Sequence, residues 1–362
     1  MNWPFSNNGA GQRRDQVLAV DFGGRTTKAV YVQRRGAEFA LCGYAVMDAP
    51  IYDRNLPPDL LTDHLKTLNQ SLAVRTKYLV LTLGVNDAIV RPVDLPRIPV
   101  DEMRQVLRNN SRMYMQQDMK DYAFDCHVIP PWHQKTAGEA RTAPTATGPG
   151  LQKEKVLVAS AKKQLLDDLV EGIKGAGFVA DQIVPALIGP VNAFEMAMPE
   201  IFKTQSVALV DIGFKSSSIC ILQKGELFLN RIVGLGGDKL TSSLSESMKI
   251  SYAEAEGIKV GMPQEVRPVL ESVLSPLGRE LRASIDFFEH QQDKVVSQVF
   301  LSGASARSEV VQQALQNELT VECKTWDPTG WLKMELPPKQ AAELEHLAPQ
   351  LTVALGAAIT AF

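Results

Sequence analysis

Two segments of the chain place an aspartate, a glycine and hydroxyl or cationic side chains directly after an apolar run. The first reads VLAVDFGGRTTKAVYV over residues 17–32, and the second reads VALVDIGFKSSSICIL over residues 207–222. The two align without a gap, and each predicts a strand, a tight turn and a second strand. Because solenoid repeats recur every ~20–50 residues, the much larger separation of these segments indicates a duplicated domain.

The chemistry that such a pair could carry is the binding of a polyphosphate. A hairpin tip of the form Asp-x-Gly offers backbone N–H groups to phosphate oxygens, and glycine leaves out the Cβ that would block their approach. Asp21 and Asp211 end the two strands and could hold Mg²⁺, usually through water. Lys28, on the returning strand, could direct its ammonium at the same phosphates. One such turn alone is weak evidence, since Asp and Gly are common in turns.

The surrounding pattern predicts the elements that must position these turns. Strands are expected at 17–21, 28–33, 39–46, 78–83, 155–161 and 299–301, and helices at 60–73, 100–115, 164–175, 239–248, 252–259, 266–290 and 351–362. Pro92, Pro96 and Pro99 are expected to break the chain where a small inserted unit begins. Residues 134–154, rich in Ala, Thr, Gly and Pro without periodicity, predict a loop.

Composition excludes several classes of protein. A net charge of -3 gives no broad basic field, so nucleic acid is not an expected partner. The four cysteines lie far apart with no metal-ligand spacing, which fits a reducing compartment. No run of about 18 apolar residues indicates a membrane span.

The order of the motifs resembles the superfamily of actin, Hsp70 and FtsA. The two hairpins are followed by Gly236, Gly237 and Asp238, then by Glu256 and Lys259, then by an LSG motif at 301–303. Within the superfamily the chain is similar to the PilM family. The segments that carry this likeness are LPRIPVDEMRQVLRNNSRMYM (95–115), GELFLNR (225–231), GGDKLT (236–241), SYAEAEGIKVG (251–261) and LTVALGAAI (351–359).

The resemblance implies an α/β fold of the actin-like type, in which a ribonuclease H-like unit is duplicated into two lobes with an inserted small α/β (SHS2-like, 1C) subdomain. The expected division is a flexible tail at 1–16, a first lobe (1A) at 17–91 and 179–204, the inserted subdomain at 92–178 with a mobile loop at 134–154, a second lobe (2A) at 205–238 and 295–362, and a helical subdomain (2B) at 239–294.

The resemblance also implies a site for ATP and Mg²⁺. The first phosphate loop would comprise Gly23, Gly24, Arg25, Thr26 and Lys28 with Asp21 near the metal, and the second would comprise Gly213, Lys215 and Ser216 with Asp211 near the metal. Gly236 and Gly237 would pass close to the nucleotide, Glu256 and Lys259 would reach the ribose and base, and Gly303 would lie under the adenosine. From spacing alone, Glu256 and Lys259 could equally be an i,i+3 ion pair.

The chain departs from the family pattern at a few of these positions. Gly24 and Arg25 replace the usual serines, and Ala304 and Ser305 replace two glycines of an LSGGGA motif. No residue stands out as the base that would activate water, so no catalytic residue is assigned. We therefore expect nucleotide binding with slow or absent hydrolysis.

The implied role is a cytoplasmic scaffold, peripheral at the inner membrane, of a type IV pilus or type II secretion-like machine. The implied partner is the N-terminal tail of a PilN-like inner-membrane protein, received by residues 92–178. A pilus motor ATPase, other platform proteins and self-association are further candidates. Two alternatives stay open. A sugar or acetate kinase would need a catalytic Asp between the lobes, and an FtsA-like division protein would carry an amphipathic helix beyond its last domain, whereas this chain stops at Phe362.

Overall fold

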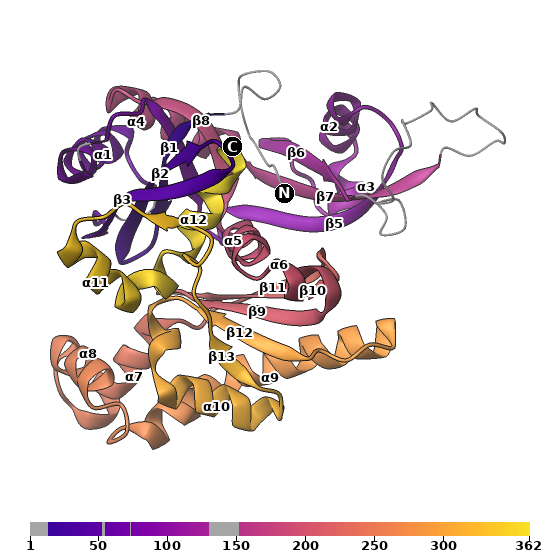
Figure 1. Ribbon diagram of the computed structural model, residues 1–362. Helices are drawn as coiled ribbons and strands as arrows, with labels where there is room; N and C mark the ends of the chain where they lie inside the picture. The colour runs from indigo at the N-terminus through magenta and orange to yellow at the C-terminus, as the bar shows by residue number, and fades with distance from the viewer. Residues whose placement is uncertain (1–13, 53–54, 73, 130–151) are drawn as a thin grey trace.

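Three β-sheets organise the protein in a computed structural model that describes residues 14–52, 55–72, 74–129 and 152–362 (Figure 1). The first sheet has the order β14-β3-β2-β1-β4-β8, from β1 (Gln16–Phe22), β2 (Thr26–Arg35), β3 (Glu38–Asp48), β4 (Tyr78–Leu83), β8 (Val179–Pro185) and β14 (Lys333–Met334). The second has the order β11-β10-β9-β12-β13, from β9 (Ser206–Ile212), β10 (Ser217–Gln223), β11 (Glu226–Val233), β12 (Gln298–Ser302) and β13 (Cys323–Thr325). The third has the order β5-β7-β6, from β5 (Ala88–Pro96), β6 (Tyr122–Val128) and β7 (Lys153–Lys162).

The first two sheets repeat one arrangement. β1 and β2 form an antiparallel hairpin that pairs Asp21 with Lys28, and β9 and β10 form the equivalent hairpin that pairs Asp211 with Ser218. A parallel strand then lies beside the first strand of each hairpin, β4 beside β1 and β12 beside β9. The duplication that the sequence predicted is therefore confirmed.

Helices cover the outer faces of the two large sheets and fill the space between them (Figure 1). On the first sheet lie α1 (Pro58–Leu72) and α4 (Lys163–Gly175), and on the second lie α7 (Gly237–Met248), α9 (Arg267–Gln292) and α10 (Glu309–Leu319). Between the sheets lie α5 (Gly189–Ala197) and α12 (Thr352–Ala358), with α6 (Pro199–Thr204) and α11 (Pro338–Leu347) nearby. α8 (Tyr252–Gly261) packs on α7, and α2 (Val100–Asn109) and α3 (Ser111–Met115) cover the third sheet.

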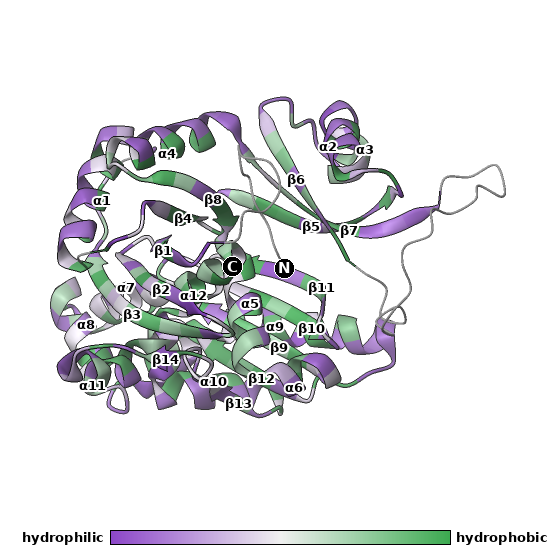
Figure 2. Cartoon of the chain, turned by 45° about the horizontal axis from the view of Figure 1, so that its top comes forward, coloured by the Kyte–Doolittle hydropathy of each residue, from purple (hydrophilic) through white to green (hydrophobic). Residues whose placement is uncertain are grey.

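The burial of apolar residues explains this layering. Apolar residues follow the central strands and the inner sides of the helices, while hydrophilic residues colour the outer sides (Figure 2). Burying such surface is the main favourable contribution to folding. Within the described parts of the chain, no helix has the length and apolar content that crossing a membrane requires.

The structure corrects several expectations about the inserted unit. Pro92 and Pro96 do not break the chain but lie within β5, opposite Leu157 and Lys153 of β7. Proline is tolerated there because β5 is an edge strand, whose second edge needs no ladder donor. The helix expected at 100–115 is divided at Asn110 into α2 and α3. β7 begins at Lys153, so the predicted loop ends earlier than expected, and its residues 134–151 lie outside the described residues.

The first described residues meet the C-terminal end of the chain at the first lobe. Of the expected tail, residues 1–13 lie outside the described part, while the amide of Arg14 donates to the carbonyl of Ala361 at 2.9 Å and Gln16 opens β1. β14 pairs with β3, and α12 packs against β1 and β4. Part of the segment 295–362 thus belongs with the first sheet rather than the second.

Candidate functional site

Asp21 and Asp211 are held in the same way in the two halves of the fold. The hydroxyl of Thr82 in β4 donates to Asp21 Oδ1 at 2.9 Å, and the hydroxyl of Ser302 in β12 donates to Asp211 Oδ1 at 2.7 Å. Each donor comes from the strand that runs parallel to the one carrying the aspartate. The duplicated fold therefore gives each carboxylate a fixed orientation.

The charge of Asp21 acts on the buried carboxylate of Asp211. Burial raises the pKa of Asp211, and the nearby charge of Asp21 raises this pKa further, while the Ser302 hydrogen bond and the charge of Lys28 oppose the rise. Lys28 Nζ lies 3.5 Å from Asp21 Oδ2. An electrostatic effect of this kind indicates that the two aspartates lie near each other, one from each half of the fold. The structure thus brings together Asp21, Asp211 and Lys28.

The tips of the two hairpins touch. A Cβ at Gly24 would lie 3.6 Å from the ring of Phe214, which is an ordinary contact across the two lobes. A Cβ at Gly23 would lie 2.7 Å from Lys28 Nζ and from the carbonyl oxygen of Thr26, so this position requires glycine. Arg25 and Thr26 complete the first tip.

The second tip is fixed to the start of α7. The amide of Gly213 donates to the carbonyl of Ser216 at 3.1 Å, which closes the turn around Phe214 and Lys215. The amide of Gly237 donates to Gly213 at 2.9 Å. A Cβ at Gly236 would lie 2.7 Å from the carbonyl carbon of Phe214. The two glycines therefore allow α7 to begin directly against the second hairpin.

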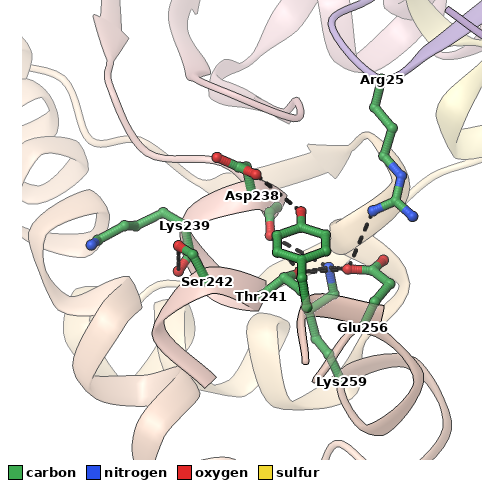
Figure 3. Close-up of polar contacts among 9 residues, drawn as sticks. Arg25, Asp238, Lys239, Thr241, Ser242, Glu256 and Lys259 are labelled. Atoms are coloured by element: carbon green, nitrogen blue, oxygen red, sulfur yellow. Dashed lines mark hydrogen bonds and ion pairs between the residues drawn. The ribbon is translucent and has the colours of Figure 1, made fainter. Parts of the chain in front are cut away.

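A polar cluster on α7 and α8 lies beside these tips (Figure 3). Lys259 Nζ donates to Glu256 Oε2 at 2.7 Å and lies 2.8 Å from Thr241 Oγ1, whose hydroxyl also donates to Glu256. Burial alone would raise the pKa of Glu256, but hydrogen bonds from Lys259 and Thr241 and the charges of Lys259 and Arg25 outweigh it and lower the pKa. Glu256 is therefore an anion in the folded protein.

The start of α8 is well defined, which fixes this cluster. The Ser251 hydroxyl accepts from the amide of Glu254, and the Glu254 carboxylate accepts from the amide of Ser251, so the two residues form a capping box. Such a box satisfies two amides at the helix start. Glu256 and Lys259 thus have a rigid support.

A pocket of about 350 Å³ adjoins the cluster. Its walls include Glu256, Lys259 and Val260 from α8, and Ala304, Ser305 and Ser308 from the segment after β12. The hydroxyl of Ser308 is buried and has no hydrogen-bond partner among the described residues. The pocket therefore combines apolar walls with polar groups that a ligand could satisfy.

Gly303 forms the turn between β12 and the following segment, which lines the pocket. Its φ of +91° is one that side chains with a Cβ rarely adopt, and a Cβ would also lie 2.8 Å from the carbonyl carbon of Ile212. Within this segment the next residues, Ala304 and Ser305, do not have positive φ. Their side chains are thus compatible with the local backbone, although the family pattern has glycine there.

Comparison with known proteins identifies the family. A model of the family described as type IV pilus assembly protein PilM matches residues 19–362. The chain belongs to the PilM family. This confirms the relationship that the sequence motifs indicated.

Solved structures agree with this assignment. The structure of a PilM-PilN type IV pilus biogenesis complex matches with a TM-score of 0.81 and 22% identity, over 96% of this chain and 99% of that chain. The ethanolamine utilization protein EutJ from Carboxydothermus hydrogenoformans matches with a TM-score of 0.56 and 14% identity, over 99% and 92%. MreB5 of Spiroplasma citri bound to AMPPNP matches with a TM-score of 0.51 and 11% identity, over 97% and 96%. The actin-like fold is therefore confirmed.

The cell division protein FtsA of Bacillus subtilis (strain 168) is 32% identical over 112 residues. These residues are 31% of this chain and 24% of FtsA, so the match spans about a quarter of that relative. The likeness supports the superfamily, and the family model places the chain with PilM.

Several residues of this PilM-family site were not foreseen from the sequence. Thr82 and Ser302 fix the aspartates, Thr241 connects Glu256 to Lys259, and Asp238 accepts from Lys215 at 2.8 Å and from the Tyr252 hydroxyl at 3.0 Å. A signal existed for two of them, because Thr82 and Ser302 are single polar residues at the ends of apolar strands.

The two aspartates can be compared with what a metal ion requires. Over the described ranges, no group of three or more His, Cys, Asp and Glu side chains could enclose an ion. Asp21 and Asp211 would fit Mg²⁺, which keeps several waters and binds through one or two carboxylates together with phosphates.

Proposed function

We propose that the chain binds ATP with Mg²⁺ between the two hairpin tips and acts as a scaffold in type IV pilus assembly. The observation that carries this proposal is the equivalent placement of Asp21 and Asp211 in the two halves of the fold, each fixed by a hydroxyl from the neighbouring parallel strand. A polyphosphate between them would meet Lys28 from one lobe and Lys215 from the other. Mg²⁺, held through water by the aspartates, would neutralise phosphate charge.

The adenosine part of the nucleotide has a matching place. The ribose hydroxyls would lie beside Glu256 and Lys259, and the base would enter the 350 Å³ pocket next to Ser308. The sequence assigns no residue as a base for water, so we propose binding without rapid hydrolysis. A sugar or acetate kinase would need such a base.

Thermal unfolding with added ligand tests nucleotide binding. A ligand selective for the native state raises its stability, by about 2.7 kcal/mol at a concentration 100 times Kd. We expect ATP with Mg²⁺ to raise the Tm, and we expect Lys215→Ala to reduce this rise. The control is Lys120→Ala, which removes an exposed lysine in the turn before β6. A Tm that ATP with Mg²⁺ leaves unchanged would refute the proposal.

A second groove supports the role as a scaffold. It has a volume of about 490 Å³ and lies between β5 of the inserted sheet and β11 of the second sheet. Both are edge strands, and Asn230 Nδ2 in β11 donates to the carbonyl of Val90 in β5 at 3.1 Å. Unpaired strand edges beside apolar side chains are a common docking place for extended peptides.

We infer that this groove takes the N-terminal tail of a PilN-like inner-membrane protein. The groove meets the expected receiving unit, residues 92–178, only at Pro92, and its other walls come mainly from the start of β5 and from β11. The similar PilM-PilN complex supports this kind of partner. Through it the protein would be cytoplasmic and peripheral at the inner membrane. Association with a pilus motor ATPase or other platform proteins, and self-association, are further parts of the proposal.

A peptide titration tests the groove. Ile232, 37% exposed, lies in the groove, and Met113, 74% exposed, lies on α3. We expect Ile232→Asp to weaken binding of the PilN-like tail on the order of tenfold or more, because a charge would be buried by the peptide. Met113→Asp should bind as the wild type does. Equal loss in both variants, or in neither, would refute the assignment of the groove.

A further inference from the structure

Four cations beside the hairpin tips each have a carboxylate partner among the described residues. Lys28 pairs with Asp21, Lys215 with Asp238, and both Lys259 and Arg25 with Glu256. A polyphosphate entering the site must therefore compete with these carboxylates for the cations. The pairs differ in how readily the cation can exchange its carboxylate for a phosphate.

The pair of Arg25 with Glu256 is unlike the other three, because it joins the two lobes. Arg25 comes from the tip of the first hairpin, and Glu256 from α8 on the second lobe (Figure 3). The distance from Arg25 Nη1 to Glu256 Oε2 is 3.4 Å, longer than that of a charge-assisted hydrogen bond. The Arg25 side chain is 42% exposed, so it has room to turn.

Arg25 also has a counterpart in the duplicated fold. It stands four residues after Asp21, as Lys215 stands four residues after Asp211. The two cations lie at the same aromatic ring, with Arg25 Cζ 5.7 Å and Lys215 Nζ 5.2 Å from the centre of Phe214. Both positive charges thus lie at the contact between the hairpin tips, where the proposed phosphates would bind.

We propose that Arg25 is an exchangeable link between the lobes. When a nucleotide binds, the Arg25 side chain moves away from Glu256 and binds the phosphates. This inference rests on the proposed ATP site. A planar guanidinium binds phosphate through two hydrogen bonds, which its single long contact with Glu256 does not provide. Glu256 remains satisfied without Arg25, because it keeps Lys259 and Thr241.

The exchange has a structural consequence. While Arg25 contacts Glu256, the lobes are joined directly across the site; after the exchange they are joined through the nucleotide. Arg25, Lys259 and Thr241 all contact Oε2 of Glu256, so the departure of Arg25 leaves this carboxylate more open to a ribose hydroxyl. The arrangement of the lobes therefore depends on the phosphates, which gives a scaffold a response to nucleotide without hydrolysis.

Binding measurements on Arg25→Ser separate this role from a merely structural one. We expect ATP with Mg²⁺ to bind on the order of tenfold more weakly to this variant, the effect of losing a charge-assisted contact. Adenosine, which has no phosphates, should bind at least as tightly as it binds to the wild type, because Glu256 is released. Arg25→Lys, which keeps the charge but not the planar fork, should give an intermediate ATP affinity. The exposed Arg112→Ser is the matched control.

Spin labels report the distance between the two lobes. Cysteines at Gln70 in α1 and Glu246 in α7, both exposed, can be labelled after Cys42→Ser, since the remaining thiols are buried. Without nucleotide, Arg25→Ser should broaden the distance distribution between the labels, and Arg112→Ser should not. In the wild type, ATP with Mg²⁺ should shift the distribution, whereas adenosine should not.

The outcomes distinguish the two proposals. If the wild type binds ATP, and Arg25→Ser binds ATP and adenosine as the wild type does, the link is refuted while the ATP site stands. Equal weakening of ATP and adenosine would also refute the exchange, because it indicates a structural defect. If the wild type does not bind ATP, the ATP site and the exchange both fail, whatever the label distances show.

Discussion

Replacing Gly303 with alanine tests how the second lobe approaches the nucleotide pocket. Gly303 follows β12, has a φ of +91°, and faces the backbone of Ile212 in β9. An added Cβ would lie 2.8 Å from the carbonyl carbon of Ile212 and 3.0 Å from its nitrogen, and it would overlap the oxygen more closely still. The atoms that it meets are backbone, so no side chain can turn away.

The expected loss of stability follows from two effects. A residue with a Cβ in this region, where φ is positive and ψ is extended, costs about 1–3 kcal/mol, and overpacking in a closed site costs about 1–3 kcal/mol. Together they predict a loss of about 2–6 kcal/mol in the free energy of unfolding. Because Ile212 precedes Gly213, the displaced backbone would also move the second hairpin tip, so ATP affinity should fall as well.

Urea unfolding followed by circular dichroism measures the first effect, and ATP titration the second. Gly257→Ala is the matched control, because Gly257 lies in α8 with no heavy atom within 4 Å of the added Cβ, and alanine favours a helix by about 0.5–1 kcal/mol. The reasoning is refuted if Gly303→Ala unfolds within about 0.5 kcal/mol of the wild type, the range of an ordinary surface substitution.

Three further predictions concern the site and the packing beneath it. Lowering the pH should weaken Mg²⁺-dependent ATP binding at a pH above that of an ordinary aspartate's titration, because burial raises the pKa of Asp211 and only its ionised form serves Mg²⁺. Calorimetry from about pH 8 down to about pH 4 measures this, and a loss of binding only at the pH of an ordinary aspartate would contradict it. Asp238→Asn should release Lys215 and tighten ATP binding a few-fold at low salt, on the scale of an exposed ion pair; unchanged or weaker affinity would show that Asp238 does not compete with phosphate. Gly356→Ala should destabilise the protein by roughly 2 kcal/mol or more in urea, because its Cβ would overlap the backbone of Gly189 where α12 crosses α5, and wild-type stability would contradict this packing.

The sequence predicted the hairpins because their signal is local. An apolar run, Asp-x-Gly and a second apolar run fix a strand, a turn and its returning strand within sixteen residues. The same pattern at two places then indicated the duplication. The pairing of Asp21 with Lys28 follows from that turn alone.

The remainder of the site depends on contacts between distant segments. Thr82 reaches Asp21 only because β4 lies parallel to β1, and parallel neighbours are not specified by a turn. Arg25 and Glu256 meet only when both lobes are placed. The error at Pro92 has the same origin, since an edge strand tolerates proline and the order of strands in a sheet is not visible in a local pattern.

A comparison of ATP binding by Asp21→Asn and Asp211→Asn would decide whether the two hairpins serve one nucleotide. Calorimetry in the presence of Mg²⁺ should give one ATP per wild-type chain, and each substitution alone should weaken binding by at least an order of magnitude, the scale of losing a contact to a charged group. If either variant bound ATP as tightly as the wild type, the nucleotide would not be shared between the two halves of the fold.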